Sequence, residues 1–171
     1  MSELTDFRGA KDEFFGSDHH SPLTHEQQDG FDGLSYYDED PDLRYELEVE
    51  RLDKRERIEM QTSTGDVADY TRWGTISFQV EGGPAQLTLY KDEGGEGFFL
   101  PFADATSGEE TYASGRYLDP PVLSNGKVLV DFNHAYSPYC AYNQQWSCPL
   151  TPFENRLKVA IRAGEKDFKQ T

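Results

Sequence analysis

The sequence predicts a mainly β protein: an antiparallel β-barrel or curved sandwich with one or two N-terminal helices as a cap. About eight short segments that alternate apolar and polar residues follow one another at roughly ten-residue spacing after residue 42. Turns containing glycine or proline join most of these segments, as is typical of antiparallel neighbours. Aromatic residues make up 13% of the chain and compensate for a hydrophobic fraction of only 36% in building a core.

The first 42 residues carry two helical patterns. Residues 3–16 place an apolar stripe at helical spacing and end at Gly16, so we expect a helix there. Thr24 and Gln27 match a capping box, which predicts a short helix over residues 25–30. Residues 1–42 are therefore expected to form a helical cap on a β domain over residues 43–171. The stripe consists of Leu4, Phe7, Lys11, Phe14 and Phe15.

The remaining chain supplies the strands. Period-two alternation and turn signals such as Asn125-Gly126 set their approximate limits. The expected strands are LRYELEVERL (43–52), RIEMQT (57–62), YTRWGTISFQV (70–80), AQLTLYK (85–91), FFLPFA (98–103), TYASGRYL (111–118), KVLVDF (127–132) and LKVAIRA (157–163).

Composition restricts the possible partners. The chain has 32 acidic and 16 basic residues, a net charge of −16, which opposes binding to nucleic acid or anionic lipid. No apolar run approaches the ~20 residues of a membrane span, and the charged N-terminus lacks an apolar signal core, so a cytoplasmic protein is expected. Pervasive acidity with little lysine favours a halophilic source over an ordinary acidic protein, because molar salt screens self-repulsion.

The segment 131–166 is the expected site. It holds both cysteines and many aromatic residues, and we expect it to cover one mouth of the barrel and form a pocket for a small anionic or planar ligand. Arginines in so acidic a chain also commonly form structural ion pairs, and the aromatic group Tyr136, Tyr139, Tyr142 and Trp146 could equally be a small core. The candidate ligand-binding residues are Arg116, Tyr117, Asn133, Tyr136, Asn155 and Arg156.

Cys140 and Cys148 leave several alternatives open. Their spacing is not the Cys-x2-Cys of zinc sites, and adding His134 gives only three soft ligands, so metal binding is disfavoured. Buried free thiols are the main expectation, with a disulfide or redox switch as the alternative. A Ser107 or Ser137 triad with His134 lacks a nucleophile-elbow motif.

Three further histidines, His19, His20 and His25, lie in the expected turns of the N-terminal part. A metal site would need them to converge with acids such as Asp18, whereas exposed surface histidines are the simpler interpretation.

The phrases FADATSGEETYASGRYLD, VLVDFNHAYSPYCAY and CPLTPFENRLKVAIRAGEK resemble the DUF1684 family, a bacterial and archaeal domain of unknown function. The opening FFGSDHHSPLTHEQQDGFDGLSYYDEDPDLRYE is similar to that of the family, so the resemblance spans nearly the whole chain. It implies no activity, and His134 departs from the family pattern. The matching positions are Gly115, Arg116, Tyr117, Leu118, Asp131, Phe132, Asn133, Ala135, Tyr136, Cys140, Ala141, Cys148, Pro149, Leu150, Asn155, Arg156, Leu157, Ala163, Gly164, Glu165 and Lys166.

Three functions are consistent with these observations. The first is a small-molecule-binding β-barrel domain. The second is an oxidoreductase similar to the flavin-binding split-barrel group, often dimeric, which rests on analogy of fold alone and makes flavin a possible cofactor and a homodimer a possible assembly. The third is a redox-responsive structural protein that uses Cys140 and Cys148.

Overall fold

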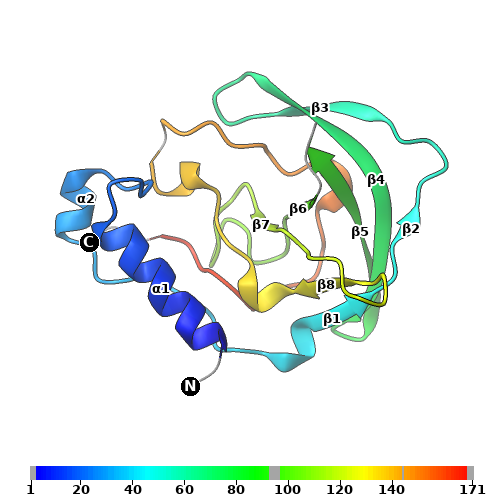
Figure 1. Ribbon diagram of the computed structural model, residues 1–171, viewed down its shortest axis with the longest axis horizontal. Coiled ribbons are helices and arrows are strands. Elements are labelled where there is room, and N and C mark those ends of the chain that lie inside the picture. Colours follow the sequence, from blue (N-terminus) through cyan, green and yellow to red (C-terminus); the bar gives the residue numbers. More distant parts are fainter. Residues whose placement is uncertain (1–2, 93–96, 144, 169–171) are drawn as a thin grey trace.

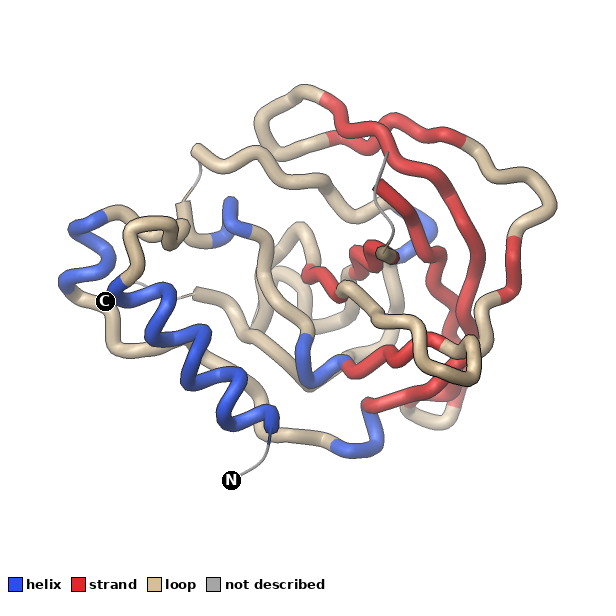
Figure 2. The backbone as a smooth tube through the Cα atoms, viewed as in Figure 1, coloured by secondary structure: helices blue, strands red, loops and turns tan. Residues whose placement is uncertain are grey.

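The computed structural model describes residues 3–92, 97–143 and 145–168. Two helices lie on one side of the molecule and most strands lie on the other, with irregular segments between them (Figures 1 and 2). The helices are α1 (Glu3–Ser17) and α2 (His25–Asp29), and the 3-10 turns are η1 (Pro41–Leu43), η2 (Phe132–His134), η3 (Tyr139–Ala141) and η4 (Phe153–Asn155). The strands are β1 (Arg44–Leu47), β2 (Glu50–Arg51), β3 (Arg57–Gln61), β4 (Val67–Val80), β5 (Gly83–Asp92), β6 (Phe98–Phe102), β7 (Arg116–Leu118) and β8 (Val128–Asp131).

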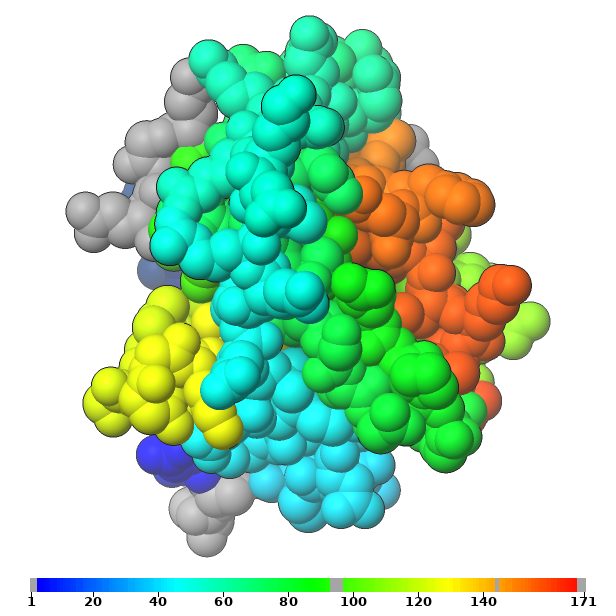
Figure 3. All heavy atoms as spheres, turned by 90° about the vertical axis from the view of Figure 1, so that its right-hand side faces the viewer, coloured from blue at the N-terminus to red at the C-terminus, as the bar shows by residue number. Residues whose placement is uncertain are grey.

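The strands form two antiparallel sheets. The larger has the order β2-β4-β5-β6-β7 with β3 also paired to β4, and the smaller pairs β1 with β8. Over the described residues the sheets do not close into a barrel, so the curved sandwich is confirmed and the barrel alternative is wrong. Figure 3 shows the side away from α1, where segments that include β1 to β5 form the surface.

Strand β4 has 14 residues and pairs with three strands, β2, β3 and β5. Its register with β5 shifts between Arg72 and Gly74, which is the signature of a bulge. A side chain at position 74 would place its Cβ 2.7 Å from Val49 and 2.8 Å from the carbonyl oxygen of Glu50. Glycine at this position therefore lets β2 approach β4 closely.

Two hydrophobic cores stabilise the fold. The main core lies between the sheets and includes Ile76, Leu89 and Val130, each at most 1% exposed. The second core lies beneath the helices, where Phe15 and Tyr142 pack with ring centroids 5.0 Å apart. The second core joins α1 to the irregular segment that follows β8, so it fixes the relative position of the helical cap and the strands.

The predictions for the N-terminal residues are confirmed closely. The helix expected over residues 3–16 is α1, and Thr24 and Gln27 form the expected capping box at the start of α2. In the described part of the chain, α1 is the longest helix, and none is long and apolar enough to cross a lipid bilayer.

One expected strand is absent. Residues 157–163 have apolar alternation but no strand conformation. Their backbone groups bond to a side chain and a loop instead of a neighbouring strand: the carbonyls of Ile161 and Ala163 accept from the Arg116 guanidinium, and the amide of Ile161 donates to Asp104. The strand expected over residues 111–118 is also shorter, since only Arg116–Leu118 pairs with β6.

Candidate functional site

A cavity of about 570 Å³ opens between α1, the large sheet and the segment that follows β8. Nine of its fourteen lining residues are aromatic, so its walls offer ring faces more than polar groups. The lining residues are Phe7, Lys11, Phe14, Phe15, Tyr70, Phe99, Tyr117, Tyr136, Pro138, Tyr139, Trp146, Ser147, Cys148 and Pro149.

One face of α1 supplies the first wall. Phe7 and Lys11, Lys11 and Phe14, and Lys11 and Phe15 are each three or four residues apart, and side chains at such spacing project from the same side of a helix. The helix is positioned by Phe15, which is 2% exposed in the second core. The amphipathic stripe predicted from the sequence is thus both the attachment of the helix and a wall of the cavity.

The sheet supplies the second wall as a series of touching rings. Tyr70 on β4 stacks on Phe99 of β6 with centroids 5.2 Å apart, and Phe99 meets Tyr117 of β7 edge to face at 4.7 Å. Tyr117 meets Tyr136 edge to face at 5.8 Å. Such contacts fix each ring through its neighbour, so this wall is preorganised.

The third wall comes from residues 136–149. This segment is held at the β3–β4 turn, where the amide of Ser63 donates to the carbonyl of Cys148 at 2.9 Å. Tyr139 and Trp146 meet with ring centroids 5.3 Å apart, and both are more than a third exposed. Large aromatic side chains that stay exposed beside a cavity are unusual for a plain core and are suited to contact a ligand.

Charge inside the cavity is neutralised. Lys11 is the one cation among the described lining residues, and its Nζ lies 2.7 Å from Oε2 of Glu165, which is 1% exposed. Burial raises the pKa of Glu165, while Lys11 opposes that shift. The ammonium also lies 5.2 Å from the centre of the Tyr136 ring. The cavity therefore presents a paired charge and not a free cation.

Two of the candidate ligand-binding residues, Tyr117 and Tyr136, line the cavity. The hydroxyl of Tyr117 donates to the carbonyl of Pro149, and that of Tyr136 donates to Asp119 at 2.6 Å. Burial raises the pKa of both phenols, so both are neutral at ordinary pH. Their hydroxyls are engaged by the protein, which leaves the ring faces as the surfaces they offer.

Arg116 lies inside the fold, away from the cavity lining. It is 0% exposed, and its guanidinium donates to the carbonyls of Ile161 at 2.8 Å, Ala163 at 2.5 Å and Glu165 at 3.2 Å. Nη2 also lies 3.6 Å from Oδ2 of Asp104. Burial lowers the pKa of Arg116, an effect that Asp104 opposes. These contacts give Arg116 a structural role: it holds the irregular C-terminal segment against β7.

Asn133, Asn155 and Arg156 also lie outside the cavity lining. The amide of Asn133 exchanges two hydrogen bonds with the backbone of Asp40, at 2.8 and 2.9 Å, and ties the end of the cap to the residues after β8. Asn155 is 0% exposed and bonds to both backbone groups of Thr88 and to the carbonyl of Pro101. The side chain of Arg156 is exposed. The structure thus brings together two of the six candidate residues.

Cys140 and Cys148 are both buried free thiols. The amide of Cys140 donates to Sγ of Cys148 at 3.2 Å, and the Tyr112 hydroxyl lies 3.6 Å from Sγ of Cys140. A hydrogen bond from Cys148 lowers the pKa of Cys140 to about 6, and the same partnership raises the pKa of Cys148. Cys148 faces the cavity, so the pair connects to it.

His134 is not part of the cysteine pair. Its Nε2 lies 3.7 Å from Asp131, and its ring meets Phe7 edge to face at 4.9 Å. In the described residues, the potential ligand atoms of His134 and the two cysteines do not gather within reach of one ion. His134 instead lines a smaller neighbouring cavity of about 310 Å³ that shares Phe7 and Tyr136 with the first.

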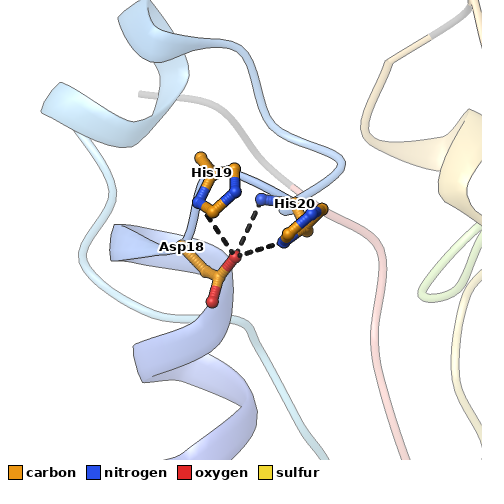
Figure 4. Close-up of side chains that lie close together, drawn as sticks. All are labelled: Asp18, His19 and His20. Atoms are coloured by element: carbon orange, nitrogen blue, oxygen red, sulfur yellow. Dashed lines mark hydrogen bonds and ion pairs between the residues drawn. The ribbon is translucent and has the colours of Figure 1, made fainter.

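Asp18, His19 and His20 do bring three potential metal ligands within 4.8 Å of one another, in the turn after α1 (Figure 4). Oδ1 of Asp18 accepts from the amide of His20 at 2.8 Å and lies 3.2 Å from its Nδ1. The backbone hydrogen bond from His20 lowers the pKa of Asp18. The histidine side chains are 81% and 74% exposed, and the contacts close the turn that ends the helix.

Several lining residues were not singled out as site residues by the sequence. Lys11, Phe14 and Phe15 were visible only as the stripe of a helix, and Tyr70 and Phe99 only as strand residues. The aromatic group after β8 was visible, and three of its four members line the cavity. The fourth, Tyr142, belongs to the second core. The available signal in the sequence was the presence of three phenylalanines in the apolar stripe of this helix.

Comparisons with known proteins agree with the resemblance noted in the sequence. The structure is similar to the solution NMR structure of an uncharacterized protein of Haloarcula marismortui, with 38% identity, a TM-score of 0.72, and coverage of 96% of this chain and 92% of that one. No curated protein matches. The profile of the family described as protein of unknown function (DUF1684) matches residues 29–166. The chain therefore belongs to the DUF1684 family of proteins of unknown function.

Proposed function

We propose that this protein binds a small planar molecule of largely apolar character in the aromatic cavity. The single observation that carries the proposal is the lining itself: nine aromatic side chains from α1, three strands and the segment after β8 surround a volume of about 570 Å³. Ligand sites of small molecules have volumes of roughly 300–1,000 Å³ and mostly apolar walls with few polar groups. Aromatic rings arranged in this way can stack on a planar fused-ring compound or contact it edge to face.

The charges of the site favour a neutral ligand over an anionic one. Lys11 is already paired with Glu165 at 2.7 Å, and Arg116 and Arg156 lie outside the cavity lining. A ligand anion would have to compete with a buried carboxylate for the ammonium, and the net charge of −16 would oppose its approach. Ring stacking, and not charge, is therefore the expected source of affinity.

A flavin is a second candidate ligand, because its ring system is planar. The open sandwich weakens the analogy with closed split barrels, and the lack of a free cation in the described lining gives a flavin phosphate no evident partner. Riboflavin and flavin mononucleotide form a matched pair for this question. The proposal expects the uncharged riboflavin to bind at least as tightly as its phosphate ester.

The test is a titration of the protein with uncharged fused-ring aromatics, including riboflavin. Tryptophan fluorescence is the readout, and the Trp73→Phe substitution leaves Trp146 as the sole reporter. Tyr139→Ala removes one exposed wall ring and is expected to weaken binding about two- to tenfold, the usual worth of one aromatic contact. Phe153→Ala is the matched control, since Phe153 is 90% exposed and outside the lining. Equal effects of the two variants, or no saturable binding by any compound, would refute the proposal.

A further inference from the structure

The two cysteines form a contact pair at the edge of the cavity. Cys140 is the middle residue of η3, and its amide donates to Sγ of Cys148 at 3.2 Å. Cys148 is fixed in turn by Ser63, whose hydroxyl accepts from the Cys148 amide at 3.1 Å. Both thiols are unbonded.

We infer that Cys140 and Cys148 are a redox-active dithiol, in which Cys140 is the nucleophile, Cys148 is the resolving thiol, and a hydroperoxide such as hydrogen peroxide is the oxidant. The product is an intramolecular disulfide between the two residues. This inference goes beyond binding of a planar ligand and does not depend on it.

The distance between the two residues is compatible with a disulfide. Sγ of Cys148 lies 3.2 Å from the backbone nitrogen of Cys140. Since an N–Cα bond is about 1.46 Å long, that sulfur lies no more than about 4.7 Å from the Cα of Cys140. In a disulfide, three bonds separate the Cα of one residue from the sulfur of the other, and the last of them is an S–S bond of about 2.05 Å, so this separation is within reach of the Cys140 side chain.

The surroundings give the two thiols different roles. Interaction with the Cys148 thiol, and next with the Tyr112 hydroxyl 3.6 Å from Sγ of Cys140, lowers the pKa of Cys140 to about 6, while the pKa of Cys148 rises. Among the described residues, the phenols of Tyr112 and Tyr117 also interact with the pair. The Tyr112 hydroxyl is placed to donate to a Cys140 thiolate, which makes Cys140 the nucleophile and Cys148 the resolving thiol.

Access to the pair is limited to small molecules. The two residues are 5% and 6% exposed, and the wall of the aromatic cavity includes Cys148. A peroxide that enters through this cavity meets Cys148 first and must pass it to reach Cys140, which is not among the lining residues; a protein thiol or a bulky disulfide is too large for that path. The geometry thus favours a small inorganic or organic hydroperoxide over exchange with another protein.

The reaction balances with peroxide as the only co-reactant. The Cys140 thiolate attacks one oxygen and breaks the O–O bond, which gives Cys140 sulfenic acid and a hydroxide that takes up a proton to become water. The Cys148 thiol then attacks that sulfur, the S–S bond forms as the S–O bond breaks, and the departing hydroxyl leaves as water with the Cys148 proton. The two thiols lose two electrons and the peroxide is reduced to two molecules of water.

The test treats the reduced, folded protein with one equivalent of hydrogen peroxide, then denatures it and blocks any free thiols with an alkylating reagent before intact-mass measurement. The expected product has lost the mass of two hydrogens, takes up no label, and returns to two labelled thiols after reduction. Two labelled thiols after peroxide treatment, or cross-linked dimers in place of the internal disulfide, would overturn the inference.

Two variants assign the roles. Cys148→Ser is expected to stop at Cys140 sulfenic acid, which dimedone captures, whereas Cys140→Ser is expected to lose at least roughly tenfold of the reaction rate at pH 7, since an ordinary thiol is only a few per cent ionised there. In the wild type, brief alkylation of the native protein followed by peptide mapping should label Cys140 first, with half-maximal rate near pH 6. This wild-type measurement decides the assignment even if a variant fails to fold, and preferential labelling of Cys148 would contradict it.

Discussion

The pair formed by Lys11 and Glu165 joins the helical cap to the C-terminal segment. Nζ of Lys11 lies 2.7 Å from Oε2 of Glu165, and the two residues are 154 positions apart in the sequence. Glu165 is 1% exposed, and its second oxygen, Oε1, is buried with no hydrogen-bond partner in the described part of the structure. Lys11 is therefore the principal compensation for a carboxylate that has left water.

Replacing Lys11 by methionine keeps the stem of the side chain and removes its charge. Removal of one partner from a buried ion pair costs about 3–5 kcal/mol, because the remaining charge stays in a medium that cannot solvate it. A domain of this kind has a total unfolding free energy of about 5–15 kcal/mol, so Lys11→Met should remove a large part of it near pH 8. Glu165 limits the loss by taking up a proton.

The pH dependence follows from that proton. Burial already raises the pKa of Glu165 above its ordinary 4.5, and the loss of Lys11 removes the interaction that opposes this shift. A carboxyl whose pKa is higher in the folded state binds more protons folded than unfolded, so stability falls as pH rises above 4.5. Lys11→Met should therefore be markedly less stable at pH 8 than at pH 5, by a wider margin than the wild type.

Urea unfolding followed by circular dichroism at the two pH values measures this effect. The double variant Lys11→Met with Glu165→Gln should recover most of the lost stability and lose the added pH dependence. Lys158→Met is the matched control, since Lys158 is exposed and its replacement should change stability by no more than about 0.5 kcal/mol. If Lys11→Met costs no more than Lys158→Met, or its cost is the same at both pH values, the reasoning is refuted.

Three further predictions concern other charged groups. Arg116→Lys should destabilise nearly as much as Arg116→Met, about 3–5 kcal/mol by thermal or urea unfolding, because a single ammonium cannot reach the three carbonyls that the guanidinium bonds; full rescue by lysine would contradict this. Arg156→Ala should leave stability within about 0.5 kcal/mol and ligand affinity unchanged, and a loss of binding would return Arg156 to the site. Melting temperature should rise steeply from about 0.1 M to about 2 M KCl as the net charge of −16 is screened, and a flat profile would contradict a halophilic adaptation.

Local signals in the sequence predicted much of the fold. Thr24 and Gln27 specify the start of α2 through their own hydrogen bonds, and the alternation in residues 127–132 specifies β8. The alternation of residues 157–163 predicted a strand that does not form, because backbone carbonyls of this segment accept hydrogen bonds from Arg116, more than forty residues earlier. Whether two sheets close into a barrel depends on such distant pairings, which no local pattern encodes.

The candidate site was predicted less completely than the fold, for a related reason. The ring-rich segment with Tyr136 and Trp146 was recognisable, but its partner surface is a helix more than 120 residues earlier in the chain. Arg116 looked like an anion ligand because its chemistry suits that role, yet the same donors satisfy backbone carbonyls equally well. Sequence alone gives the type of group and not the direction in which it points.

Binding at the aromatic cavity can be tested most directly by two-dimensional NMR of the labelled protein during titration with the uncharged fused-ring compounds. The chain has two tryptophans, and their indole N–H signals separate the two outcomes: Trp146 lines the cavity and donates to the carbonyl of Pro22 at 3.2 Å, whereas Trp73 lies outside the lining beside Arg55. We predict that at least one compound shifts the Trp146 signal saturably and leaves that of Trp73 in place. No shift with any compound, or a shift of Trp73 alone, would contradict the proposed site.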